Sequence, residues 1–215
     1  MRVTVVSAVF GRYDLPVFVE QTVPCDYVLV TDGEVDVPSG WTHRVVNPGY
    51  FSPRYVAKRP KCEPWKYADG DVFVWLDGSI EPRADLVESM LDCLGDEDVA
   101  FYPHPQRSSI VSEARASMPL AKYDGQDVMG QARSYVDSGH PDDWGLWAAG
   151  LFAVRDTERT RVLGRRWMEE IERWTLQDQI SLPFVLREVG LWPASLKGSQ
   201  LGNPLFKIRR HADQT

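Results

Sequence analysis

Short apolar runs alternate with polar, glycine-containing turns along most of the chain. The Val-rich run 3–9 ends in a turn at 10–14, and the run 27–31 ends at Asp32 and Gly33. The run 72–76, Val-Phe-Val-Trp-Leu, is apolar at every position, as expected of a central strand that is covered on both faces. We predict strands at these three places. Weaker patterns predict shorter strands at 43–46, 99–102 and 151–154.

Apolar residues with a spacing of three and four mark the helices between these strands. The pattern predicts helices at about 83–94, 157–174 and 179–189, the second capped by Asp156 or Thr157. We predict that residues 106–141 form an insertion of helix and loop, with a helix at 127–137. Strands that alternate with helices are typical of parallel sheets, so we expect an α/β fold with a mostly parallel central sheet flanked by helices. No repeat or linker divides the chain, and we expect a single domain over 1–215.

Composition narrows the possible partners. The chain has 215 residues, with 24 Lys and Arg against 31 Asp and Glu, for a net charge of -7. Non-specific binding to nucleic acid or to an anionic membrane requires a basic surface, so this balance argues against both. No segment approaches the ~20 apolar residues of a membrane span. Three cysteines make no paired framework, and we expect reduced thiols and a cytoplasmic location.

The candidate chemistry lies directly after the predicted strands, because ligands of open α/β sheets collect at the carboxyl ends of the strands. Asp77 follows the strongest strand, and Gly78 beside it leaves room for a phosphate or a metal ion. The alternative is an Asp that bonds the backbone of its own turn.

A basic group precedes the same strand. Cations at a spacing of three and four can share one face of a helix and bind a diphosphate, although most charge clusters are solvated surface. The group consists of Arg54, Lys58, Arg59 and Lys61.

In this order, the pieces resemble the GT-A fold of nucleotide-sugar glycosyltransferases. More narrowly, the chain resembles the glycosyltransferase-like domain family known from plant turgor-regulation and seed-mucilage proteins, and the resemblance spans nearly the whole chain. The pieces that carry it are Ser52 to Lys61, Trp75-Leu76-Asp77-Gly78, His104-Pro105-Gln106-Arg107 with Glu113, Gly145 to Gly150, and Leu176-Gln177-Asp178-Gln179.

The resemblance implies a nucleotide-sugar donor and a divalent cation, Mn²⁺ or Mg²⁺, on its diphosphate. By analogy with the Asp-x-Asp signature of GT-A enzymes, the metal would be held by Asp77, Ser79 and His211. Ser79 stands where that signature has its second Asp, and a hydroxyl is the weaker ligand. The tail 195–215 would close over the donor site. The donor-binding residues implied in this way are Phe10, Gly11, Arg12, Asp32, Arg54, Lys58, Lys61, Asp77, Gly78 and Ser79.

The resemblance also implies residues on the acceptor side. Asp178 is the candidate to stabilise an oxocarbenium-like transition state or to orient the acceptor hydroxyl. His104 follows a short predicted strand and is the candidate for proton transfer, because the ordinary pKa of histidine lies near neutral pH. The alternatives are a helix cap for Asp178 and a hydrogen-bonded loop residue for His104. The implied acceptor-binding residues are Trp144, Trp147, Gln179 and Arg107. For the two tryptophans, stacked core aromatics are the alternative.

The acceptor stays open between a glycan, a small molecule and a modified base of a nucleic acid, which the basic stretch 207–210 would contact. Two other functions also stay open: a non-catalytic nucleotide-sugar binder, in which Ser79 reflects lost catalysis, and a ceramidase-like hydrolase by analogy within the family. Only four histidines are present, which argues against a His-rich hydrolytic metal centre.

Overall fold

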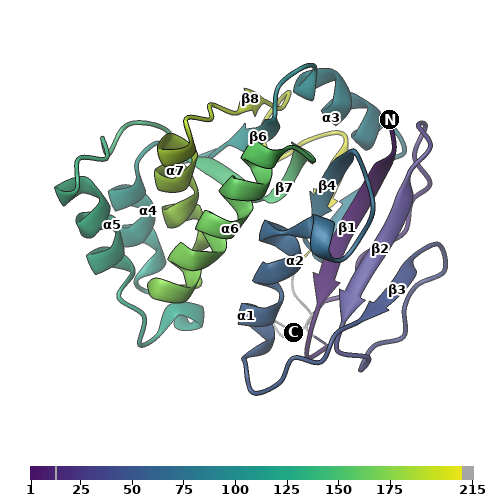
Figure 1. Cartoon of the computed structure of the whole chain (residues 1–215), viewed down its shortest axis with the longest axis horizontal. Helices are drawn as coiled ribbons and strands as arrows, with labels where there is room; N and C mark the ends of the chain where they lie inside the picture. Colours follow the sequence, from purple (N-terminus) through teal and green to yellow (C-terminus); the bar gives the residue numbers. More distant parts are fainter. Residues whose placement is uncertain (13, 210–215) are drawn as a thin grey trace.

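The computed structural model describes residues 1–12 and 14–209 and contains a seven-stranded sheet in the order β3-β2-β1-β4-β7-β6-β8 (Figure 1). The strands are β1 (Val3–Val9), β2 (Asp26–Thr31), β3 (Thr42–Val45), β4 (Val72–Leu76), β6 (Val99–Pro103), β7 (Trp147–Arg155) and β8 (Ala194–Ser195). The pairs β2–β3, β1–β2, β1–β4 and β6–β8 are parallel, and β7 runs antiparallel to β4 and β6. The predicted α/β fold with a mostly parallel sheet is confirmed.

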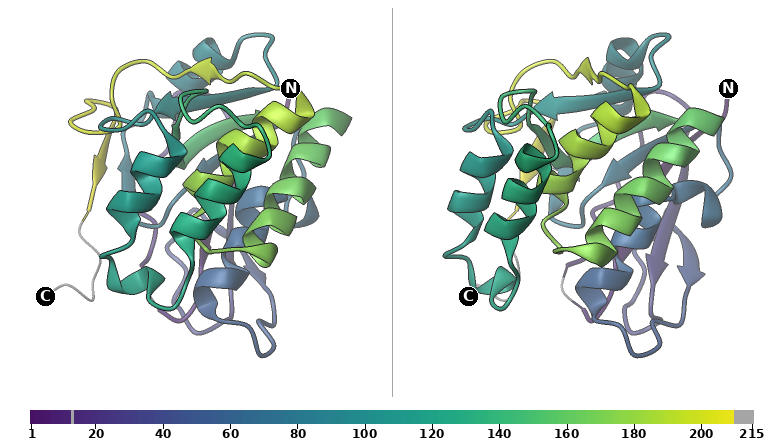
Figure 2. Two further views of the ribbon diagram at one scale, coloured as in Figure 1. Left: turned by 90° about the vertical axis from the view of Figure 1, so that its left-hand side faces the viewer. Right: turned by 60° about the vertical axis from the view of Figure 1, so that its left-hand side comes forward.

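Helices cover both faces of the sheet. In Figures 1 and 2, α6 and α7 lie side by side with α2 on one face, α3 lies on the other, and α4 and α5 pack beside α7 at one end. The helices are α1 (Pro53–Val56), α2 (Lys58–Cys62), α3 (Leu86–Leu94), α4 (Ile110–Ser117), α5 (Val128–Asp137), α6 (Glu158–Arg173) and α7 (Asp178–Val189). Two 3₁₀ turns, η1 (Pro64–Lys66) and η2 (Ala121–Tyr123), and a small sheet of β5 (Ile80–Pro82) with β9 (Phe206–Ile208) complete the elements.

The apolar strand β4 divides its side chains between two cores. Val74 and Leu76 pack with α3, whereas Phe73 and Trp75 pack with α6 and α7 on the opposite face. Successive strand residues point to opposite faces, so a strand covered on both sides must be apolar throughout.

Helix ends follow the residues predicted to set them. Thr157 begins α6 through a capping box with Thr160, and its hydroxyl accepts a hydrogen bond from the Thr160 N–H at 3.2 Å. Gly190 ends α7 with a φ of 71°, a backbone conformation that glycine adopts without a steric penalty.

Pairing between distant segments changed two expectations. The strand predicted at 151–154 begins four residues earlier, because Trp147 and Ala148 pair with the end of β6 beyond an irregularity in the register. The polar tail predicted no strand, yet β9 pairs with β5. Local pattern misses both, since their hydrogen bonds are formed with distant parts of the chain. No helix among the described residues is long and apolar enough to cross a membrane.

Close packing of α6 on α2 positions the segment that carries the predicted basic group. A Cβ added to Gly164 would lie 2.0 Å from the carbonyl oxygen of Cys62 and 2.5 Å from the Trp65 ring. Both are far inside van der Waals contact, so only glycine lets the two helices approach this closely.

Gly164→Ala therefore should force α2 away from α6. We expect the free energy of unfolding to fall by about 2 kcal/mol, which is typical of overpacking against a backbone atom. Urea denaturation measures the change. Arg165→Ala, on the exposed side of the same helix, is the control and should change it by less than ~0.5 kcal/mol. Equal stability of Gly164→Ala and the wild type would contradict the packing described.

Candidate functional site

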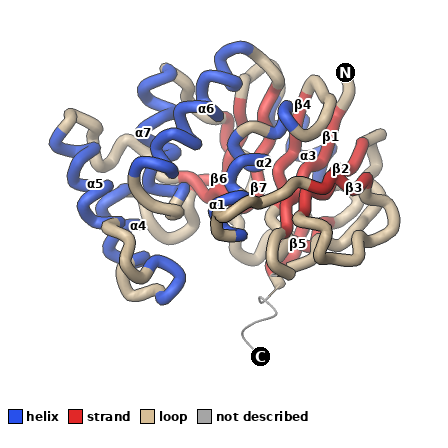
Figure 3. Tube along the Cα trace, turned by 60° about the horizontal axis from the view of Figure 1, so that its bottom comes forward, coloured by secondary structure: helices blue, strands red, loops and turns tan. Residues whose placement is uncertain are grey.

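A cavity of about 430 Å³ opens at the carboxyl ends of β1 and β4. Its walls come from residues 8–11 at the end of β1, from 52–61 in and before α1 and α2, and from 75–79 at the end of β4. Figure 3 brings this edge of the sheet forward, with α1 and α2 beside the strands. Of the ten residues predicted to bind the donor, all but Arg12 and Asp32 line the cavity.

Asp32 and Arg12 support the wall instead of forming it. The Asp32 carboxylate accepts the Gly11 N–H at 2.7 Å and the Glu34 N–H at 3.1 Å, which fixes the loop after β1. Arg12 turns outward, and its Nε donates to the carbonyl oxygen of Glu34 at 2.9 Å. The prediction that these two side chains line the donor pocket is therefore corrected.

Two lysines converge on one buried carboxylate at the inner wall. The Nζ atoms of Lys58 and Lys61 lie 2.6 Å and 2.7 Å from Asp178 Oδ2, and Lys61 Nζ also lies 3.5 Å from Asp77 Oδ1. The side chains of Lys61 and Asp178 are only 5% and 6% exposed. This lysine–aspartate cluster joins α2, α7 and the end of β4.

At Asp178 and Lys61, the effect of neighbouring charges on the pKa is larger than the effect of burial. Burial raises the pKa of Asp178, but Lys58 and Lys61 together hold it well below its ordinary value. Burial lowers the pKa of Lys61, but Asp178 and Asp77 raise it above the ordinary lysine value. At Lys58 burial prevails and the pKa is lowered. Asp178 is therefore an anion, and Lys61 a cation, at neutral pH.

The predicted basic group divides among three environments. Lys58 and Lys61 belong to the lysine–aspartate cluster, so they are not a solvated face. Arg59 lies outside the cavity lining, and its guanidinium stacks at 5.2 Å on the rings of Phe51 and Tyr55.

Arg54, the fourth member, lines the cavity beside a lysine that the sequence did not single out. Its guanidinium donates to the carbonyl oxygen of Lys122 and lies 5.2 Å from the Tyr123 ring, while Lys122 Nζ lies 5.0 Å from the same ring. Within the described part of the chain, neither Arg54 nor Lys122 is in an ion pair. The sequence did not indicate Lys122 because it lies in the insertion, and the position of the insertion relative to the sheet cannot be predicted from local sequence patterns.

Hydrogen bonds fix Asp77 in the cavity wall next to the lysine–aspartate cluster. Trp75 Nε1–H donates to Asp77 Oδ1 at 2.7 Å, and the Asp77 N–H donates to the carbonyl oxygen of Gly150 at 2.9 Å. A Cβ on Gly150 would lie 3.1 Å from Asp77 Oδ2, so glycine makes room for the carboxylate.

The described residues do not fit the divalent cation that the resemblance implies. Of the three predicted ligands, His211 lies outside the described residues. Asp77 Oδ1 is occupied by the Trp75 N–H, and the Lys61 ammonium lies 3.5 Å away. Among residues 1–12 and 14–209, no three His, Cys, Asp or Glu side chains gather where they could hold a metal ion. Mg²⁺ and Mn²⁺ favour several oxygen ligands without an adjacent cation.

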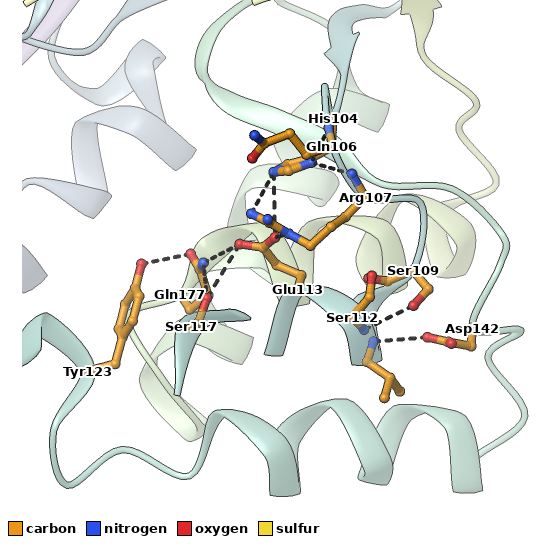
Figure 4. A network of polar contacts seen from close by, with 11 residues as sticks. His104, Gln106, Arg107, Ser109, Ser112, Glu113, Ser117, Tyr123, Asp142 and Gln177 are labelled. Carbon is orange, nitrogen blue, oxygen red and sulfur yellow. Dashed lines mark hydrogen bonds and ion pairs between the residues drawn. The ribbon is translucent and has the colours of Figure 1, made fainter. Parts of the chain in front are cut away.

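Figure 4 shows His104 inside a polar network that borders the insertion. Its Nδ1 accepts the N–H groups of Gln106 at 3.3 Å and Arg107 at 3.0 Å, and its Nε2 lies 3.5 Å from Glu113 Oε2. Burial lowers the pKa of His104, and the charge of Arg107 lowers it further against the opposing effect of Glu113. His104 does not line the cavity, so its part in proton transfer stays a prediction, and the geometry favours the loop-structural alternative.

Gln177 connects this network to Asp178. Its Nε2 donates to Glu113 Oε1 at 2.7 Å and to Ser117 Oγ at 2.8 Å, and its Oε1 accepts the Tyr123 hydroxyl at 2.9 Å (Figure 4). The neighbouring Leu176 N–H donates to Gln126 Oε1 at 2.7 Å. The insertion therefore fixes the segment from which Asp178 projects. From the sequence, we singled out Asp178 and Gln179 in this stretch but gave Gln177 no role, because its partners Glu113, Ser117 and Tyr123 lie far away in the sequence.

The predicted acceptor residues do not form one surface. Trp147 is 4% exposed and packs in the core beside Phe152 and Trp167, which corrects its predicted role. Trp144 is half-buried against it and against the exposed Trp192.

The two polar members of the predicted set also lie away from the cavity. Arg107 Nε donates to Glu113 Oε2 within the network of Figure 4. Gln179 lies in the first turn of α7 and does not line the cavity.

A doubly covered α/β sheet with a cavity lined by Arg54, Lys58 and Lys61 at its carboxyl edge is the architecture expected of a nucleotide- or phosphate-dependent enzyme. The family model of the TOD1/MUCI70 glycosyltransferase-like domain matches residues 42–197, and the chain belongs to this family. The family supports a function in glycosyl transfer. The matched range contains Arg54, the lysine–aspartate cluster and the polar network.

Among solved structures, an apo structure of WbbM, a bifunctional glycosyltransferase, is similar to this chain with a TM-score of 0.49 and 14% sequence identity. The similarity covers 88% of this chain and 37% of WbbM, so the chain spans little more than a third of that protein. No curated protein matches the sequence.

Asp178→Asn should leave two buried ammonium groups without their shared counter-ion. We expect the free energy of unfolding to fall by about 3–5 kcal/mol, the usual cost of breaking a buried ion pair from one side. Adding Lys58→Met should recover at least ~1 kcal/mol, because one stranded charge is then removed.

Denaturation of the single and double variants by urea measures this coupling. Asp124→Asn removes an exposed carboxylate as the control and should be close to neutral. Additive effects of Asp178→Asn and Lys58→Met would contradict the shared ion pair.

Proposed function

We propose that this chain transfers a sugar from a nucleotide-sugar donor to a hydroxyl acceptor. Membership of a glycosyltransferase-like family supports the reaction class. The observation that carries the donor assignment is the cation Arg54 in the cavity wall with Lys122 beside it, since neither is in an ion pair within the described residues. A diphosphate brings the complementary charge, and both side chains bind phosphate oxygens well.

The lysine–aspartate cluster supports the same assignment. When the bond between the sugar C1 and the diphosphate oxygen breaks, its electron pair moves onto that oxygen. Positive groups fixed beforehand near this position stabilise the developing charge without reorganisation. Lys58 and Lys61 are fixed in this way by Asp178 and line the cavity together with Arg54.

Asp178 would act by its charge and not as a base. Its pKa is held well below the ordinary carboxyl value, because the effect of two lysines exceeds that of burial, so it takes up a proton poorly near neutral pH. Asp178 is not among the lining residues, so its proposed part is to hold Lys58 and Lys61 in the cavity wall, and its persistent negative charge keeps them there. The acceptor hydroxyl would attack C1, and its proton would leave to the departing diphosphate or to solvent.

The donor is testable by thermal unfolding in the presence of nucleotide sugars. A panel with uridine, guanosine, adenosine, cytidine and thymidine diphosphate sugars should contain at least one that raises the Tm, since a ligand of the native state stabilises it by mass action. A panel without any stabilising member would contradict the proposal.

Arg54→Gln and Lys122→Gln should each weaken the binding of the stabilising nucleotide sugar about tenfold. Loss of one charge-assisted hydrogen bond is worth ~1.4 kcal/mol, which corresponds to that factor. Isothermal titration calorimetry measures the Kd. Arg115→Gln, on the exposed face of α4, removes the same charge and should leave the Kd unchanged within twofold. An unchanged Kd in both cavity variants would remove the basis for the donor assignment.

A further inference from the structure

The loop 77–79 lies between two cations of the chain. On one side is Lys61, whose ammonium is 3.5 Å from Asp77 Oδ1 and 5.7 Å from the centre of the Trp75 ring. On the other side is Arg209, which directly follows β9. Its Nη2 donates to the carbonyl oxygen of Gly78 at 2.6 Å, and its backbone N–H donates to that of Ser79 at 2.8 Å.

Arg209 is held at this place by structure far from it in sequence. The strand before it pairs with β5, with Ile208 opposite Ile80, so the end of β9 runs back along the loop after β4. Its guanidinium also donates to the carbonyl oxygen of Leu15. Nε is buried and has no hydrogen-bond partner within the described residues. The positive charge of Arg209 is therefore fixed beside the loop 77–79 by its hydrogen bonds to Gly78 and Leu15.

Ser79 matches the same chemistry. It lines the cavity with 8% of its surface exposed, at the place where the Asp-x-Asp signature of GT-A enzymes, which the resemblance brought in, has its second carboxylate. Without a metal between them, a carboxylate would repel the oxygens of a diphosphate. A hydroxyl instead donates a hydrogen bond to such an oxygen. A serine at this position is therefore favourable in a site where the balancing charge comes from side chains.

We infer that Lys61 and Arg209 supply, at the Asp77 loop, the positive charge that a divalent cation would otherwise supply, so that the diphosphate of the donor binds without a metal. The inference rests on the proposed function, because it concerns the same donor. The Lys61 ammonium repels a second cation from Asp77, and its burial keeps that repulsion strong. Lys61 lines the cavity and can donate a charge-assisted hydrogen bond to a phosphate oxygen. Arg209 is not among the lining residues and contributes through its positive charge beside the loop.

The test is a calorimetric titration with five nucleoside diphosphates, those of uridine, guanosine, adenosine, cytidine and thymidine. Each is titrated once in EDTA and once in MnCl₂. We expect the tightest-binding of them to have the same Kd in both buffers within twofold. Binding that requires Mn²⁺ would overturn the inference and leave the proposed function intact. Absence of binding for all five in both buffers would overturn the proposed function together with the inference.

Variants of Arg209 test its part separately. Arg209→Gln should raise the Kd in EDTA at least tenfold, while Arg209→Lys, which keeps the charge, should recover most of that loss. Arg83→Gln is the matched control, because Arg83 is an exposed arginine just after β5 and its loss removes the same charge; its Kd should stay within twofold of the wild type. A Kd in Arg209→Gln equal to that of the control would overturn the assignment of Arg209, and circular dichroism at the assay temperature shows that each variant is folded.

Discussion

The buried ion pairs of Asp178 with Lys58 and Lys61 are the interaction on which the site depends. They join α2, which approaches from the loop after β3, to the start of α7, which follows the longest helix. Neither lysine could be buried as a cation without the carboxylate, and the carboxylate could not be buried as an anion without the lysines. These ion pairs therefore fix the positions of Lys58 and Lys61 in the wall of the cavity at the end of β4.

Two packing features hold these ion pairs in register. Gly164 lets α6 contact the backbone of α2 directly, which fixes the height of the lysines above the sheet. On the opposite side, Gln177 ties the segment before α7 to Glu113 and Tyr123 of the insertion. The insertion thus stabilises the position of Asp178 and also brings Lys122 beside Arg54. Fold and site are coupled because the same contacts serve both.

Much of this architecture could be predicted from the sequence. The central strand β4, its exit at Asp77 and the helices α6 and α7 follow from apolar periodicity and capping residues, which are local signals. A basic group before β4 and an aspartate before the last long helix were also recognisable. The ion pairs of Lys58 and Lys61 with Asp178 could not be predicted. About 120 residues separate the partners, and no local sequence pattern indicates their contact.

The same limit explains the other differences. Trp147 lies in the core because β7 extends to pair with β6, and Arg209 reaches the Asp77 loop because β9 pairs with β5. Both depend on strand pairing between distant segments, so local sequence patterns predict loop or tail at these positions. Family membership supplies the reaction class, while the arrangement of charges around the cavity supplies the argument for a diphosphate donor.

The central claim is that this cavity breaks the bond between a sugar and a nucleoside diphosphate. Phosphorus-31 NMR follows bond breaking directly, and water can serve as the acceptor when no sugar acceptor is added. In the presence of the wild-type chain, the resonances of one nucleotide sugar should convert to those of the free nucleoside diphosphate. The variant Arg54→Gln, which is expected to bind the donor more weakly, should slow this conversion when the donor is below its Kd. A nucleotide sugar that binds in the cavity and whose resonances stay unchanged, with water and with sugar acceptors alike, would contradict the account and mark the chain as a binding protein.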